Sequence, residues 1–117
     1  MNQQSQQSGV YLLAPHQLPL EVDAISLAQH GCVTKDTILS SLTKAFAFPA
    51  YFGNNWDAAY DCLLERFDQL KHGRDVYFTL TAATEVDESA LNTFKSLLED
   101  VCDQQEQDRP LHFFIVT

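Results

Sequence analysis

The alternation of β-prone runs and helix-patterned segments between residues 9 and 116 is the feature that most constrains the fold of this chain. Short apolar runs rich in β-branched and aromatic residues are typical of strands. Segments with apolar residues three and four positions apart predict helices. Because the two kinds of segment alternate without long linkers or internal repeats, we expect an α/β layer fold with a mainly parallel sheet.

Four segments are predicted to form strands. Residues 76–80 (VYFTL) and 111–116 (LHFFIV) are nearly continuous apolar runs, the kind expected of buried parallel strands. Residues 9–14 (GVYLLA) form a short apolar run that Pro15 ends, and residues 22–27 (VDAISL) alternate apolar and polar side chains. We therefore expect a small sheet of three to four strands.

Three main helices are predicted from their caps and their apolar stripes. Thr34 can cap the first helix, and Pro49 ends it because a proline disfavours the α conformation of the residue before it. Asn55 can cap the second helix, and either Thr84 or Asp87 can cap the third. The apolar stripes are Ile38, Leu39, Leu42 and Phe46, then Trp56, Ala59, Leu63 and Phe67, then Leu91, Phe94, Leu98 and Val101.

The chain length of 117 residues predicts one domain, which we place at residues 9–117. Residues 1–8 are rich in glutamine and serine and have no apolar core, so we expect a flexible tail and not a secretory signal. No apolar run approaches the ~20 residues that a membrane-spanning helix needs. We therefore expect no membrane partner.

The cysteines and histidines give no sign of a metal site or of a disulfide framework. Cys32, Cys62 and Cys102 are odd in number and far apart, and the four histidines are equally scattered. Reduced thiols fit a reducing compartment, so we expect a cytoplasmic protein. No Gly-rich phosphate loop, serine elbow or Cys/His pair is present. We therefore expect no catalysis, no cofactor and no metal.

The charge of the chain argues for a basic partner. Sixteen acidic against seven basic residues give a net charge of −9, which would repel nucleic acid and anionic membranes. Residues 54–68 hold four acids and one base, and residues 85–108 hold eight acids and one base. Nearly all the charge therefore lies on two predicted helices. A role of the acids in solubility alone remains an alternative.

Asp57, Tyr60 and Asp61 stand at positions i, i+3 and i+4 of the second predicted helix, so they share one face, and Leu64 extends it. Each also has a simpler interpretation. Asp57 would be stabilised by the helix dipole, Tyr60 would be partly buried, and Asp61 would be a solvated acid. A catalytic or metal-binding carboxylate pair is a further alternative, but two carboxylates supply only two ligands.

The segment FPAYFGNNWDAAYDCLLERF, residues 48–67, resembles the barstar family of ribonuclease inhibitors. The resemblance rests on the spacing of an aromatic pair with glycine, an asparagine cap, two aspartates and a cysteine. In that family the loop and helix enter the active site of the nuclease, where the second aspartate occupies a phosphate position. The resemblance therefore implies a fold with helices packed on a small parallel sheet.

The resemblance implies roles for several residues. Asp61 would be the phosphate mimic, Asp57 would flank it, and Tyr51 would pack from the loop. Tyr60 stands where family members often have tryptophan. The family prototype has an acid on its last helix at the position of Ser96, and Glu99 or Asp103 could replace it. The expected partner-binding residues are Tyr51, Asn55, Asp57, Tyr60, Asp61, Leu64, Ser96 and Glu99.

These observations together predict an inhibitor of a basic ribonuclease, of the intracellular immunity or antitoxin type. We expect a 1:1 complex, a monomer when the protein is free, and no direct contact with nucleic acid. The alternative is an acidic interaction module, or nucleic-acid mimic, that regulates a basic protein other than a nuclease.

Overall fold

The main sheet has four parallel strands in the order β1-β6-β4-β2. A computed structural model describes residues 8–49, 55–106 and 108–117. The strands are β1 (Gly9–Leu13), β2 (Ile25–Ser26), β4 (Arg74–Thr79) and β6 (Leu111–Val116). The two central strands, β4 and β6, pair over their full lengths. The predicted α/β fold with a mainly parallel sheet is confirmed.

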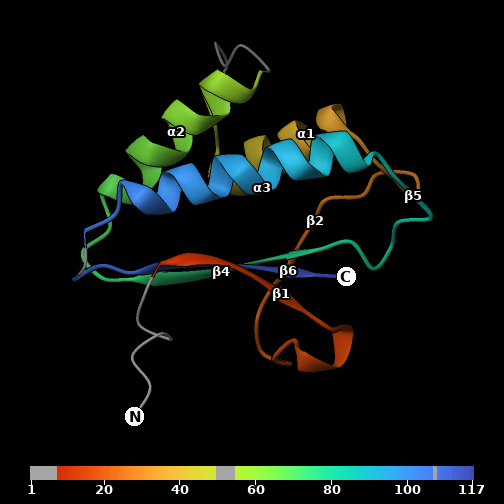
Figure 1. Ribbon diagram of the computed structural model, residues 1–117, viewed down its shortest axis with the longest axis horizontal. Helices are drawn as coiled ribbons and strands as arrows, with labels where there is room; N and C mark the ends of the chain where they lie inside the picture. The colour runs from red at the N-terminus through yellow and green to blue at the C-terminus, as the bar shows by residue number, and fades with distance from the viewer. Residues whose placement is uncertain (1–7, 50–54, 107) are drawn as a thin grey trace.

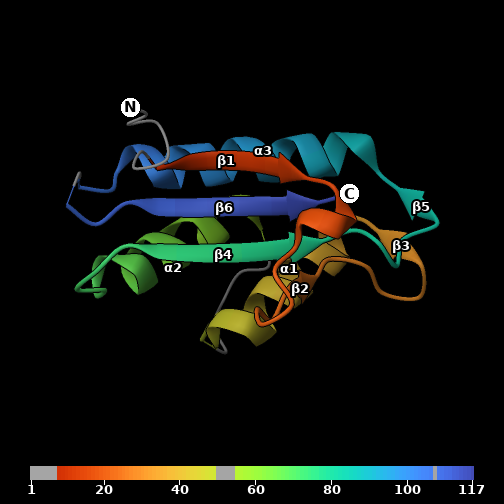
Figure 2. The same ribbon diagram turned by 90° about the horizontal axis from the view of Figure 1, so that it is seen from below.

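Three helices cover one face of this sheet (Figure 1; Figure 2 shows the opposite face). They are α1 (Lys35–Phe46), α2 (Trp56–Asp68) and α3 (Glu88–Asp103). The caps expected from the sequence are present at all three N-termini. The side chains of Thr34, Asn55 and Asp87 accept hydrogen bonds from the backbone N–H three residues ahead. Asp87, and not Thr84, is therefore the cap of α3.

The hydrophobic core lies between the helices and the sheet. Phe67 of α2 and Phe94 of α3 are fully buried, as are Phe78 of β4 and Phe113 of β6. Phe94 packs edge-on against Phe78 at 5.1 Å, and Phe67 packs edge-on against Phe113 at 5.7 Å. Burying each ring contributes roughly 1.5–3 kcal/mol. The predicted apolar stripes are buried, except that Trp56 is partly exposed.

The other face of the sheet carries a row of aromatic rings in place of a helix. Tyr11, Phe114 and Tyr77 lie side by side on β1, β6 and β4. The Tyr77 and Phe114 rings stack at 4.7 Å, and Tyr11 lies 5.6 Å from Phe114. The continuous apolar character of the two central strands thus comes from a helix-covered face and from an aromatic row that is partly exposed to solvent.

The main difference from the predicted elements lies between residues 22 and 33. The strand predicted for residues 22–27 is reduced to Ile25–Ser26, which pairs only with the last two residues of β4. A second small sheet, not predicted, joins β3 (Cys32–Val33) to β5 (Glu85–Val86). A short 3-10 turn, Pro15–Gln17, was not predicted either.

Ser8 is the first described residue and lies directly before β1. Ser8, which the sequence assigned to the tail, accepts a hydrogen bond on Oγ from the backbone N–H of Leu111 at 2.7 Å. The side chain thereby connects the residue before β1 to the first residue of β6. Residues 1–7 of the predicted tail lie outside the described part of the chain.

Two arginines hold the ends of helices α1 and α2. Arg66 on α2 donates a hydrogen bond to the carbonyl of Phe46, the last residue of α1. Arg109, in the turn before β6, donates from Nη1 to the carbonyl oxygens of Asp68 and Leu70 at 3.1 and 2.8 Å. Because the last carbonyls of a helix lack partners within it, these guanidinium groups supply hydrogen-bond donors at the two helix ends.

We expect Gly73→Ala to destabilise the fold by about 1–3 kcal/mol. A Cβ at this position would overlap the carbonyl oxygen of Pro110 and lie 2.9 Å from its ring Cδ. That carbonyl accepts the first hydrogen bond between β4 and β6, from Arg74 N–H at 2.9 Å, so the backbone must move. Urea unfolding checks the effect. His72→Ala, at an exposed neighbour, should change stability by less than ~0.5 kcal/mol, and equal stability of the two variants would contradict this explanation.

Candidate partner-binding surface

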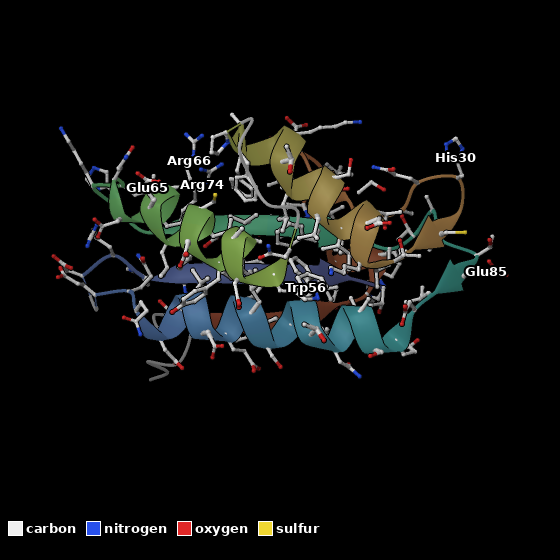
Figure 3. All side chains as sticks on the ribbon, turned by 90° about the horizontal axis from the view of Figure 1, so that it is seen from above. His30, Trp56, Glu65, Arg66, Arg74 and Glu85 are labelled. Carbon is white, nitrogen blue, oxygen red and sulfur yellow. The ribbon has the colours of Figure 1, made fainter. Side chains whose placement is uncertain are left out.

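Helix α2 lies between α1 and α3, with one flank toward each (Figure 3). Cys62 and Arg66 line a cavity together with Phe46 and Phe48 from the end of α1, so they define the α1 flank. Leu64 and Asp68 line another cavity with Gln104 and Gln105 at the end of α3, so they define the α3 flank. The rest of the outer surface of α2 faces solvent.

The predicted residues of α2 lie on its outer surface and on the α3 flank. Asp57 and Asp61 are exposed, whereas Tyr60 and Leu64 are partly buried against the core. Asn55 is exposed and caps the helix, with Oδ1 accepting from Ala58 N–H at 2.8 Å. The two aspartates are one turn apart, as the sequence predicted. Tyr51 lies outside the described residues.

The four acids of α2 are all exposed to solvent. Within the described residues, the side chains of Asp57, Asp61, Glu65 and Asp68 make no ion pair and no hydrogen bond. Two of these carboxylates act on the neighbouring thiol of Cys62. Burial first, and then the negative charges of Glu65 and Asp61, raise the pKa of this thiol. The α2 surface therefore presents unpaired negative charge that attracts cations.

The two predicted residues of α3 are both exposed, but they do not point equally toward α2. Cys102 faces the sheet, with its sulfur 3.5 Å from the carbonyl oxygen of Leu111, and Glu99 is one turn from it on the flank beside β1. Gln104 faces α2, and Asp100 is one turn from it. Ser96 lies between these two flanks.

Asp100 is thus the exposed α3 acid on the flank that faces α2. Asp100 was not among the predicted residues. The α3 positions considered were Ser96, Glu99 and Asp103, and the rotation of the helix was not known from the sequence. The apolar Leu97 would have been the signal. It widens the buried face of α3 beyond the predicted stripe, on the side where Asp100 follows three residues later.

Two kinds of feature were not found among the described residues. No group of three or more histidine, cysteine, aspartate or glutamate side chains that could hold a metal ion occurs in residues 8–49, 55–106 and 108–117. Nor does any helix in this part of the chain have the length and apolar character to cross a bilayer. The fold and the surface define a small α/β protein whose helical layer exposes two acidic helices on one side of a parallel sheet.

The comparison with protein families identifies the group to which this protein belongs. Residues 22–116 match the family described as Barstar (barnase inhibitor), so the chain belongs to the barstar family. The match spans the whole helical layer and confirms the resemblance seen in the sequence. Strand β1, at Gly9–Leu13, lies before the matched residues. Comparisons with curated proteins and with solved structures gave no match.

We expect Cys102 to be almost inert to thiol reagents while the protein is folded. Burial first, and then Asp103 and Glu99, raise its pKa to about 12 from an ordinary 9.0, against a small lowering by the Gly9 backbone. The thiolate is the reactive form, so at pH 8 its fraction falls about 1,000-fold. Alkylation rates by mass spectrometry test this, with the less buried Cys62 as the faster internal control. Reaction of Cys102 at the rate of unfolded protein would contradict it.

Proposed function

We propose that this protein inhibits a basic ribonuclease by covering the nuclease active site with α2 and the loop before it, in a 1:1 complex. One observation carries the proposal. The carboxylates of Asp57 and Asp61 are exposed, lie one turn apart within the residues that match the barstar family, and make no ion pair with any residue that the structure describes. The site of a ribonuclease must hold phosphates and is therefore rich in cationic side chains.

Asp61 has the role of phosphate mimic in this proposal. It lies beyond the first turn of α2, where the helix dipole no longer accounts for an acid. In a pocket with little water, its carboxylate would pair with arginine, lysine or histidine through charge-assisted hydrogen bonds. Tyr60 beside it offers a ring anchored in the core, which adds contact area at little entropic cost.

The remaining acids act at longer range. The net charge of −9, concentrated on the segments that form α2 and α3, creates a potential that speeds the encounter with a basic protein. Such steering weakens with ionic strength because salt screens exposed charges over about 10 Å at 0.1 M. Acids that also touch the nuclease would in addition slow dissociation.

We expect Asp61→Ala to weaken binding by about 2–5 kcal/mol, mainly through faster dissociation, because nuclease cations lose their partner in a desolvated site. Asp61→Asn should lose nearly as much, since it keeps the shape and removes the charge. The stability of the free protein should change by less than ~0.5 kcal/mol. The partner for this test is the ribonuclease that the immobilised wild-type protein captures from host lysate or medium. Surface plasmon resonance then measures its association and dissociation rates with each variant.

Glu21→Ala is the matched control. Glu21 is exposed and lies far from α2 in the chain, and its substitution removes the same charge. Only its association rate and salt dependence should shift. Glu106 is less suitable, since it lies 3.5 Å from Arg109, which holds the end of α2. If Asp61→Ala bound the ribonuclease with wild-type affinity, the proposed contact would be refuted. Capture of a basic protein without ribonuclease activity would favour the alternative function, an acidic module that mimics nucleic acid.

We expect Asp100→Asn to weaken ribonuclease binding more than Glu99→Gln. The two variants remove the same charge from adjacent positions, so long-range steering falls equally in both. Only Asp100 lies on the flank that faces α2, so the difference between them measures direct contact. A threefold or larger difference in dissociation rate is the expected result. Equal rates would show that α3 contributes only through its overall charge.

A further inference from the structure

A cavity of about 290 Å³ lies where α2 and α3 end, and its lining on α2 includes Glu65, one turn after Asp61. Leu64, Glu65 and Asp68 of α2 line one side, and Gln104 and Gln105 after α3 line the other. Among the described residues, its lining therefore combines one apolar side chain with carboxylate and amide groups and includes no cationic side chain. This volume is at the lower limit for a small-molecule pocket and suits a single side chain.

The backbone adds negative potential to this cavity. Helices α2 and α3 run in the same direction and end at the same end of the molecule (Figures 1 and 3). The C-terminus of a helix carries a partial negative charge, so two such ends act together here. Helix α3 has no basic residue in its last turn, whereas Arg66 in the last turn of α2 and Arg109 at its end offset part of the charge of that helix.

The chain itself shows which cation this junction accepts. The guanidinium of Arg109 donates to the carbonyl oxygens of Asp68 and Leu70 at the end of α2, and the carbonyl of Arg109 accepts from Gln105 Nε2 at 3.0 Å. The guanidinium of Arg109 therefore already binds the backbone carbonyl groups at the end of α2. The carboxylates of Glu65 and Asp68 make no ion pair within the described residues.

We infer that this cavity binds an arginine side chain from the rim of the basic partner, as a second contact beside the Asp61 site. The methylene chain would pack on Leu64, and the guanidinium would meet Asp68, Glu65 and the amide oxygens of the two glutamines. The inference rests on the proposed function for the identity of the partner. The chemistry of the cavity is a property of this chain alone.

The cavity is tested by NMR titration of the ¹⁵N-labelled protein with N-acetyl-arginine amide, and with N-acetyl-citrulline amide as an uncharged probe of the same shape. We expect saturable shifts at Leu64 and at the side-chain amides of Gln104 and Gln105 with arginine, and none with citrulline. The double variant Glu65→Gln, Asp68→Asn should weaken binding at least threefold. Equal shifts with both probes, or arginine shifts spread over all acids, would overturn the inference.

The same double variant is then measured against the captured ribonuclease. The control is Glu21→Gln with Asp23→Asn, which removes the same charge from exposed positions outside this cavity. We expect the first variant to dissociate at least threefold faster than the control. Equal rates would exclude the cavity as a contact while Asp61→Ala still tests the inhibitor proposal. If the captured protein is not a ribonuclease, the titration with N-acetyl-arginine amide still decides whether the cavity binds an arginine side chain.

Discussion

The full-length parallel pairing of β4 with β6 is the constraint from which the acidic surface follows. Helix α2 leads into β4, and helix α3 leads into β6. Because the two strands are parallel, the helices that precede them must also be parallel to each other, and both cover the same face of the sheet (Figure 1). Two acidic helices are thereby held side by side, with their ends at one end of the molecule.

That arrangement opposes the stability of the isolated protein. Like charges one turn apart weaken a helix by a few tenths of a kcal/mol, and the α2 acids form no ion pair with any described residue. The repulsion is tolerated because water screens exposed carboxylates and because the apolar faces below them are fully buried at Leu63, Phe67, Phe94 and Leu98. Core packing stabilises the layer, and the surface charge is left for binding.

The sequence predicted the features that depend on local pattern. Helix caps at Thr34, Asn55 and Asp87 need only residues a few positions apart, and the α2 motif has a spacing that the helix preserves. The pairing of β3 with β5 could not be predicted. A strand of two residues is too short to show a hydrophobic pattern, and each of these strands is defined only by its pairing with the other. The place of Asp100 depends on the rotation of α3, which packing under Cys102 and Leu98 determines. The cavity between Leu64 and Gln104 could be predicted only if the positions of the ends of both α2 and α3 were known.

Strand β1 has a consequence for how the chain behaves among its own copies. It lies before the residues shared with the family, and it pairs along β6, the most apolar strand of the sheet. Without β1, the backbone of β6 would be a bare edge, and uncharged apolar edges template the pairing of one chain with another. Strand β1 therefore moves the open edge of the sheet from the six residues of β6 to its own five, on the side of the sheet farthest from α1.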